Sequence, residues 1–281
     1  MLRKILKILG IVFLMLILLA IGILALYYPT AKKLFYGGEI VRPDSLLTIY
    51  LGGGGNSVVL KSDSAILVVD TKMGNPAKKL YHDVEALAAG KPVIIVNTHS
   101  DGDHVRGNPL YKDAEIISGK VDENYWILNN GKAGMPTQWV TDTLNIAMGD
   151  ETVKLINMGQ AHTWSDIVVY FQKRGLLVTG DLVFNGINTF FDAKKGSNGL
   201  KSIEALRRLN NIPGIEKVVP GHGEIGGREL ITRMQSYLDD MSLAAEKPEL
   251  EKAMKKKYKK WASMPGMASP GIVIEYFRKH P

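Results

Sequence analysis

The sequence contains no cysteine among its 281 residues. This absence excludes disulfide bonds, thiolate ligands for metals and cysteine nucleophiles together, and it leaves the redox compartment of the protein open. Histidine is scarce, with six in the chain, so the position of each one is informative. Long disordered stretches are not indicated either, and with 46% hydrophobic residues the chain can form one large domain with a buried core.

Acidic residues are missing from the first 33 positions, which hold five of the 35 basic residues. Residues 246–281 hold nine basic and four acidic residues, so 21 basic and 24 of the 28 acidic residues remain for 34–245. The net charge of +7 therefore arises at the two ends, and we expect no nucleic-acid partner, because a phosphate-binding groove needs clustered Lys and Arg. We interpret 246–281 as a basic helical extension, whose Lys-rich run 255–260 is predicted to be a solvated face, with anionic head groups as the alternative partner.

Residues 8–28 carry no charge, are mostly apolar and follow Arg3, Lys4 and Lys7. A helix needs ~20 apolar residues to cross a bilayer, whereas the apolar part of a cleaved signal peptide has roughly 7–15. We therefore predict that residues 1–33 form an uncleaved signal anchor, a transmembrane helix with its flanks, rather than a cleaved signal peptide. More basic residues precede the run than follow it, so the positive-inside rule predicts a single-pass membrane protein whose main domain lies outside the cytoplasm.

The next part of the chain alternates apolar runs with polar turns. Strands are predicted over residues 46–51, 57–60, 65–69, 93–96, 114–118, 152–157 and 167–171, and helices over 76–89, 200–209 and 228–243. The glycine run 52–55 lacks the Gly-Lys-Ser/Thr of a phosphate-binding loop, so it predicts a flexible hairpin turn. The aromatic, loop-rich segment 119–145 could form a substrate wall or pack over an edge of the core.

The densest cluster of metal-capable side chains is the hexapeptide His-Ser-Asp-Gly-Asp-His at 99–104, directly after the apolar run 93–96. Imidazole and carboxylate donors suit Zn²⁺, Mn²⁺ or Fe²⁺, although such a turn can also form for its geometry alone. His162, Asp181 and His222 follow three further apolar runs, so four of the six histidines lie at predicted strand ends. This placement is not expected by chance, and it predicts that the strand ends converge on one site.

Five motifs occur in a fixed order along the chain: Asp70 after a strand, Thr-His-Ser-Asp-Gly-Asp-His at 98–104, Gly-Gln-Ala-His-Thr at 159–163, Thr-Gly-Asp at 179–181 and Pro-Gly-His-Gly at 220–223. Over residues 46–240 they resemble the metallo-β-lactamase superfamily, specifically its dinuclear branch with glyoxalase II-like thioesterases and lactonases. The resemblance implies an α/β fold, the αββα sandwich, in which two β-sheets pack face to face with helices outside. We assign this fold to residues 34–245, preceded by the transmembrane helix.

The resemblance also implies a ligand set for two divalent metal ions. The first ion would be held by His99, Asp101 and His162, the second by Asp103, His104 and His222, with Asp181 bridging the two and Asp70 orienting a ligand imidazole from behind. Asp103 and Asp181 are also the catalytic residues that the resemblance implies.

Asp101 departs from the family pattern, which is His-x-His-x-Asp-His. An anionic oxygen donor replaces a neutral nitrogen, and the third carboxylate should make the attacking water less acidic. Oxygen donors also shift metal preference, so we expect two Zn²⁺ ions with Mn²⁺ or Fe²⁺ as alternatives. Arg106 is a smaller departure, which could contact an anionic substrate group or lie on the surface.

The predicted activity is hydrolysis of an ester, thioester, lactone or amide, β-lactams included, by a metal-bridging hydroxide that attacks the carbonyl carbon. The partners would be a small-molecule substrate and, through the N-terminal helix, the membrane. Two alternatives stay open. One is a phosphodiesterase or nuclease of the same fold, which the charge of residues 34–245 disfavours; the other is a non-catalytic metal-binding envelope domain, for which Asp101 is the argument.

Overall fold

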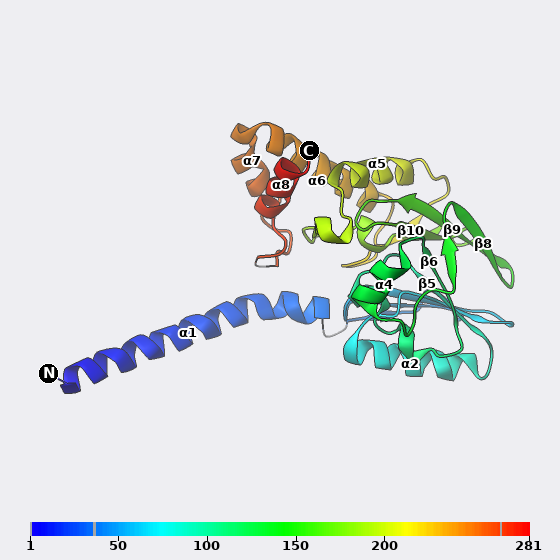
Figure 1. Cartoon of the computed structure of the whole chain (residues 1–281), viewed down its shortest axis with the longest axis horizontal. Coiled ribbons are helices and arrows are strands. Elements are labelled where there is room, and N and C mark those ends of the chain that lie inside the picture. Colours follow the sequence, from blue (N-terminus) through cyan, green and yellow to red (C-terminus); the bar gives the residue numbers. More distant parts are fainter. Residues whose placement is uncertain (1, 36–37, 265) are drawn as a thin grey trace.

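The computed structural model describes residues 2–35, 38–264 and 266–281, without the side chains of 2–6, 8, 26, 27 and 29–35. Its strands form two sheets that face each other (Figure 1). The first sheet has the order β1 (Ile40–Val41), β2 (Leu47–Tyr50), β3 (Ser57–Lys61), β4 (Ile66–Val69), β5 (Val93–Asn97), β6 (Glu115–Gly119) and β7 (Gln138–Val140). The second has the order β12 (Lys217–Val219), β11 (Leu176–Val178), β10 (Asp166–Phe171), β9 (Glu151–Gly159) and β8 (Thr143–Met148).

The apolar core between the sheets follows from the two-residue period of the strands. In β4, Leu67 and Val69 pack toward the second sheet, while Ile66 and Val68 pack on the other face with helix α2 (Gly74–Ala88). All four side chains are buried, so β4 is covered on both faces. From β4 to β7 the pairing is parallel, which brings the carboxyl ends of these strands to one edge of the sheet.

Helices cover the outer face of the second sheet as well. Leu206 of α5 (Gly199–Asn210) and Met234 and Leu238 of α6 (Glu229–Glu246) pack with Val168 and Leu177 of this sheet in one buried cluster. The predicted αββα sandwich is therefore confirmed. The short helices are α3 (Gly102–Val105), α4 (Glu123–Asn130), α7 (Glu251–Lys257), η1 (Asn108–Leu110), η2 (Gly180–Leu182), η3 (Ala193–Lys195) and η4 (Pro248–Leu250).

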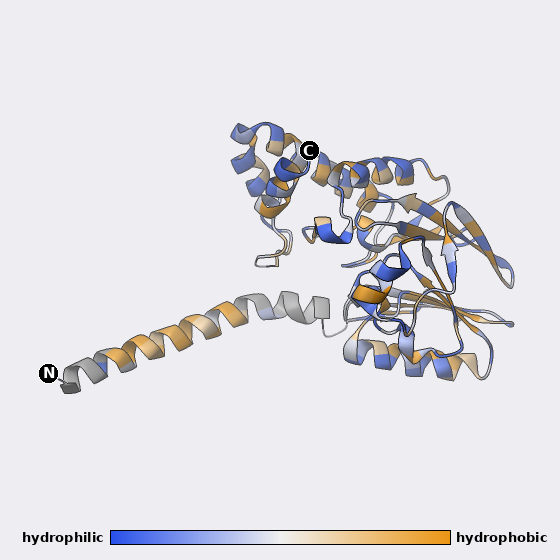
Figure 2. Ribbon diagram, in the orientation of Figure 1, coloured by the Kyte–Doolittle hydropathy of each residue, from blue (hydrophilic) through white to orange (hydrophobic). Residues whose placement is uncertain are grey.

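The N-terminal residues form helix α1 (Leu2–Phe35). Its side chains are described without interruption over residues 9–25, where they are mostly apolar and exposed (Figure 2). No helix in the described part of the chain is long and apolar enough to cross a membrane. That finding contradicts the predicted transmembrane helix, the signal anchor and the single-pass membrane location. The side chains of Arg3 and Lys4 lie outside the described residues.

The predicted C-terminal extension is helical and shares the core of the domain. Helix α8 (Pro270–Lys279) places Val273, Ile274 and Phe277 in the buried cluster that α5 and α6 also form. Helix α7 keeps its charges in solvent, where Lys257 Nζ lies 2.6 Å from an Asp240 oxygen of α6. The extension is thus a packed layer of the second half of the sandwich.

The segment 119–145, which is predicted to be rich in loops, contains α4, β7 and the start of β8. Trp126 of α4 is buried against Val105 and Val121, and its ring centroid lies 5.9 Å from that of Trp139. This segment therefore packs over an edge of the core, next to the hexapeptide.

Candidate metal centre

The predicted site residues come from the ends of separate strands that meet at one edge of the sandwich. β5 ends just before His99, and Asp101 precedes α3, which carries Asp103 and His104. His162 lies on the loop between β9 and β10, Asp181 in η2 after β11, and His222 on the loop after β12. The parallel pairing of β11 with β12 sets the last two loops side by side.

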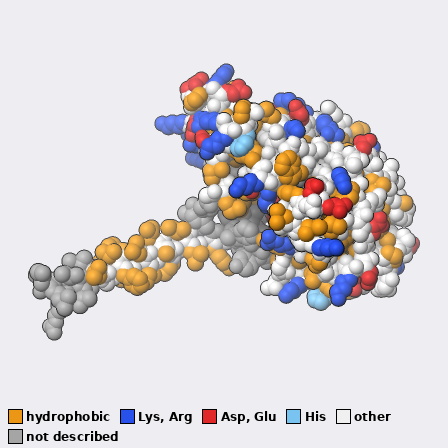
Figure 3. All heavy atoms as spheres, in the orientation of Figure 1, with side chains coloured by type: hydrophobic (Ala, Val, Ile, Leu, Met, Phe, Trp, Pro, Cys, Tyr) orange, Lys and Arg blue, Asp and Glu red, His pale blue; other side chains and the backbone are white. Residues whose placement is uncertain are grey.

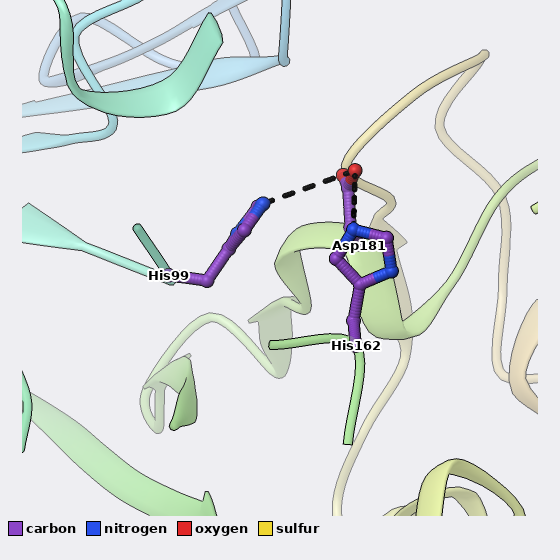
Figure 4. Close-up of side chains that lie close together, drawn as sticks. All are labelled: His99, His162 and Asp181. Atoms are coloured by element: carbon purple, nitrogen blue, oxygen red, sulfur yellow. Dashed lines mark ion pairs between the residues drawn. The ribbon is translucent and has the colours of Figure 1, made fainter. Parts of the chain in front are cut away.

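Asp181 lies at the centre of four imidazole rings. Its Oδ2 atom is 3.9 Å from His99 Nε2, 3.5 Å from His162 Nε2 and 3.4 Å from His222 Nε2, and its Oδ1 atom is 3.2 Å from His104 Nε2. Figure 4 shows His99 and His162 pointing toward this carboxylate from different loops. The glycine at 221 permits the approach, because a Cβ atom there would lie 1.9 Å from Asp181 Oδ1.

The side chains divide into two groups that could each hold a metal ion. In one group are His99, His162 and Asp181, and in the other Asp103, His104 and His222; within each, the donor atoms lie within 4.8 Å of one another. Asp101 lies beside the first group, with Oδ2 3.5 Å from His162 Nε2. The structure therefore brings together all seven residues predicted as ligands.

The chemistry of this donor set fits divalent cations. His99 Nε2 and His104 Nε2 are buried and have no hydrogen-bond partner among the described residues. Buried polar atoms are normally paired, and both nitrogens point at a cluster of carboxylates. A metal ion would satisfy the nitrogens and neutralise the carboxylates at once.

Asp70 holds both of these imidazoles in place, as predicted for one of them. Its Oδ2 atom accepts hydrogen bonds from His104 Nδ1 at 2.7 Å and from Thr98 Oγ1 at 2.7 Å, and its Oδ1 atom accepts from Thr98 N at 2.8 Å. Thr98 Oγ1 lies 2.9 Å from His99 Nδ1. Because this hydroxyl donates its hydrogen bond to Asp70, it accepts the hydrogen bond that the Nδ1–H group of His99 donates. Both rings thus carry the Nδ1 proton and turn the Nε2 lone pair into the site.

The glycine run 52–55 forms the predicted turn between β2 and β3, but it also packs on the site. A Cβ atom at Gly55 would lie 2.2 Å from His104 Cε1, so only glycine fits against this ring. Lys72 fixes the loop by donating from Nζ to the carbonyl oxygens of Gly52 and Gly55, both at 2.6 Å. Burial lowers the pKa of Lys72 to about 7, against the opposing effect of Asp70 and Asp103. No motif in the sequence indicates this contact between the glycine run and His104.

Lys195 is a second residue that sequence reasoning missed. Its Nζ atom lies 2.9 Å from Asp101 Oδ1, although the two residues are 94 positions apart. Burial alone would raise the pKa of Asp101, but His162, His99 and Lys195 outweigh it and hold that pKa far below its usual range. The carboxylate of Asp101, which departs from the family pattern, is therefore paired with the ammonium group of Lys195.

The pKa values of His99 and His222 are shifted in opposite directions. Burial, with His104 as a further cause, lowers the pKa of His99 to about 4. Burial also acts to lower the pKa of His222, yet Asp181 and Asp103 raise it to about 9. For Asp181 itself, His222 and His104 overcome the effect of burial and keep its pKa well below the usual range. In the metal-free protein the carboxylates are thus ionised, and His222 holds a proton at neutral pH.

Comparison with known proteins agrees with the fold. A metallo-β-lactamase type 2 of Bacillus cereus is 25% identical over 181 residues, which cover 63% of this chain and 70% of that protein. A probable metallo-hydrolase of Methanocaldococcus jannaschii is 26% identical over 196 residues, which cover 63% of this chain and 91% of that protein. A solved metallo-β-lactamase from Pontibacter korlensis superposes with a TM-score of 0.63 at 20% identity, over 72% of this chain and 99% of that one.

The family itself follows from the sequence match. Residues 50–223, more than half of the chain, match the model of the metallo-β-lactamase superfamily. This span contains every one of the predicted ligands and Asp70. The chain therefore belongs to the metallo-β-lactamase superfamily and is a metal-dependent hydrolase, as the motifs predicted.

Proposed function

We propose that this protein is a two-metal hydrolase of small carbonyl compounds, namely esters, thioesters, lactones or amides. The observation that carries the proposal is the position of Asp181, whose two oxygens lie 3.2–3.9 Å from the Nε2 atoms of four histidines. A carboxylate between two sets of imidazoles is suited to bridge two cations.

The ligands divide as the geometry groups them. His99, His162 and Asp101 would hold the first ion, and Asp103, His104 and His222 would hold the second, with Asp181 available to both. Zinc is the metal that we propose. Mn²⁺ and Fe²⁺ are the alternatives, because Asp101, Asp103 and Asp181 are oxygen donors, and oxygen donors shift the preference away from zinc. Lys195 supports this set by offsetting the added charge of Asp101.

Two bound divalent ions supply Lewis-acid activation of water and of the substrate carbonyl. The chain contributes fixed geometry: Asp70 and Thr98 hold two rings in the tautomer that presents Nε2. The low pKa of His99 keeps this ring neutral at physiological pH. In the reaction, the oxygen of water bonds to the acyl carbon, the bond from that carbon to the leaving oxygen, sulfur or nitrogen breaks, and the leaving group takes a proton.

The similar proteins give the substrate class only in part. The Bacillus cereus relative is a β-lactamase by name, which supports cyclic amides as candidates, while the archaeal relative is named only as a probable metallo-hydrolase. A phosphodiester is disfavoured by the surplus of acidic residues in 34–245.

Metal reconstitution with a substrate panel tests this proposal. The full chain, stripped by a chelator, is reloaded with Zn²⁺, Mn²⁺ or Fe²⁺ and assayed with p-nitrophenyl acetate, an acyl thioester, a lactone, a chromogenic cephalosporin and bis-p-nitrophenyl phosphate. We expect metal-dependent hydrolysis of at least one carbonyl substrate, lost in Asp181→Ala and kept in the exposed control Asp113→Asn. Activity on the phosphodiester alone, or no metal-dependent activity at all, would overturn the proposal.

A further inference from the structure

The pocket in front of Asp181 has two walls of opposite character. The polar lining residues, here called the polar wall, are Asp101, Asp103, Arg106, His162, Asp181, Lys195 and His222. The other wall is apolar and is built from Met73, Phe184, Ile187, Phe190, Met264 and Met267. On the face of the domain seen in Figure 3, hydrophobic side chains lie among acidic and basic ones. A substrate that contacts both walls needs a polar reacting group next to an apolar group.

The C-terminal extension supplies part of the apolar wall. Met264 and Met267 line the pocket but lie outside the family match, which ends at residue 223. Met267 is 48% exposed at the pocket, although the neighbouring Ala268 is fully buried. Methionine side chains are flexible and polarizable, so the half-buried Met264 and the exposed Met267 can adapt to an aliphatic group.

Asn188 ties this wall to the catalytic domain. It is fully buried, and its Nδ2 atom donates to Ala262 O and Ser263 Oγ, both at 3.0 Å, while Tyr237 Oη donates to its Oδ1 atom at 2.9 Å. The backbone adds a bond from Asn188 N to Ala262 O of 2.9 Å. The segment before Met264 is therefore fixed to the loop that carries Ile187 and Phe190.

A second tie connects α8 to the loop of His162. Tyr276 Oη donates to Ser197 O at 2.6 Å, and Ser197 Oγ donates to His162 O at 2.6 Å. The ring of Phe191 stacks on that of Tyr276 with centroids 4.9 Å apart. The extension is thus held against the site at both ends of the wall, which makes it part of the pocket.

We infer that the extension forms the binding surface for a short aliphatic acyl chain, with Met267 as a specificity-determining residue. This inference rests on the proposed function, because it places the acyl carbonyl at the polar wall and the chain along Met264 and Met267. The pocket has a volume of about 220 Å³. That volume corresponds to roughly seven water-sized groups, which suits a carbonyl group and a chain of about five carbons.

A chain-length series tests the inference. The zinc-loaded full chain is assayed with p-nitrophenyl acetate, butyrate, hexanoate and octanoate. We expect kcat/KM to rise about fourfold for each added methylene up to hexanoate, through a falling KM, and to fall for octanoate. In Met267→Ala the ratio of hexanoate to acetate activity should drop at least about fivefold.

Ile272→Ala is the matched control, because Ile272 is an exposed apolar residue of α8 that does not line the pocket. It should leave the chain-length ratio unchanged. If acetate is hydrolysed in a metal-dependent manner but the wild-type ratio is flat, or if Met267→Ala does not alter it, the inference is wrong while the proposed function stands.

A binding measurement decides the inference independently of turnover. Sodium hexanoate is titrated into the full chain labelled with ¹³C at the methionine methyl groups, with the Met267 resonance assigned from Met267→Ala. We expect this resonance to shift with hexanoate and not with acetate, and hexanoate to bind at least about tenfold more tightly. Equal binding of the two anions, or a Met267 resonance that does not move, would contradict the acyl-binding wall even in a protein without esterase activity.

Discussion

Asp70 is the residue through which the structure sets both inner imidazoles, so Asp70→Asn is the most informative substitution. Asparagine keeps the shape of the side chain and can still accept the bond from Thr98 N through its oxygen. Its NH2 group, however, would face Thr98 Oγ1 and His104 Nδ1, which both donate to Asp70 Oδ2 in the wild type. The NH2 group would then face two hydrogen-bond donors at a fully buried position. The negative charge of Asp70, which orients the two imidazole rings, would also be lost.

The size of the effect follows from two estimates. A hydrogen bond to a charged group contributes about 1.5–3 kcal/mol. Loss of a group that orients a metal ligand from behind typically costs about 10–100-fold in metal affinity, and at 1.36 kcal/mol for each factor of ten this is about 1.4–2.7 kcal/mol. The estimates agree, so we expect Asp70→Asn to weaken zinc binding by about 10–100-fold.

Competition with a chromophoric zinc chelator measures this change for each ion. The ion bound by His104 should weaken most, because His104 contacts Asp70 directly, whereas His99 is reached only through Thr98. Asp113→Asn, an exposed change of the same chemistry, should have no effect. A folded Asp70→Asn protein whose two zinc affinities stay within about twofold of the wild type would refute the role of Asp70.

Three further predictions concern protonation, charge and packing. Because Asp181 raises the pKa of His222 to about 9 despite burial, zinc must displace a proton from this ring below that pH, so zinc affinity should rise up to about pH 9; a chelator titration that levels off near pH 7 would speak against this. Lys195→Met should shift the acid limb of the kcat/KM profile upward by at most about one pH unit, since Lys195 is partly exposed, with Lys195→Arg restoring it; an unshifted limb in Lys195→Met would argue against charge compensation. Asn188→Ala removes four side-chain hydrogen bonds and should lower the free energy of unfolding in urea by about 3 kcal/mol; a loss under about 1 kcal/mol would mean that the bonds do not stabilise the wall.

The sequence was sufficient where chemistry follows a strand directly. His99, Asp181 and His222 each come within a few residues of an apolar run, and in the structure their loops meet at one edge of the two sheets. This result is expected, because parallel pairing of β4 to β6 and of β11 to β12 brings the carboxyl ends together. Strand period and residue type therefore predicted the grouping of the site, whereas the sandwich was predicted from the resemblance of the motifs to a known family.

Contacts between loops could not be predicted from the sequence in the same way. Lys195 reaches Asp101 from a position 94 residues away, and Asn188 reaches Ala262 across 74. Such pairs depend on how helices and loops pack, and they leave no periodic signal in the chain. Helix α4 was missed for a related reason, because Trp126 is its one fully buried side chain among the described residues and no apolar stripe repeats along it.

The C-terminal extension, residues 246–281, adds residues outside the family match to the pocket of the site. Helix α8 buries Val273, Ile274 and Phe277 in the domain core, and the segment between α7 and α8 brings Met264 to the pocket. The family motifs end before it, at residue 223. A domain limited to the matched residues would lack one wall of the pocket, so substrate preference should depend on residues beyond the family pattern.

The position of Asp181 between two ions is the central claim, and anomalous scattering from crystals grown with zinc tests it most directly. The account predicts two zinc peaks about 3.5–4 Å apart, each about 2.0–2.2 Å from an Asp181 oxygen, with His99 and His162 at one peak and His104 and His222 at the other. A single zinc peak under saturating metal, or two peaks of which neither contacts Asp181, would contradict the two-metal site.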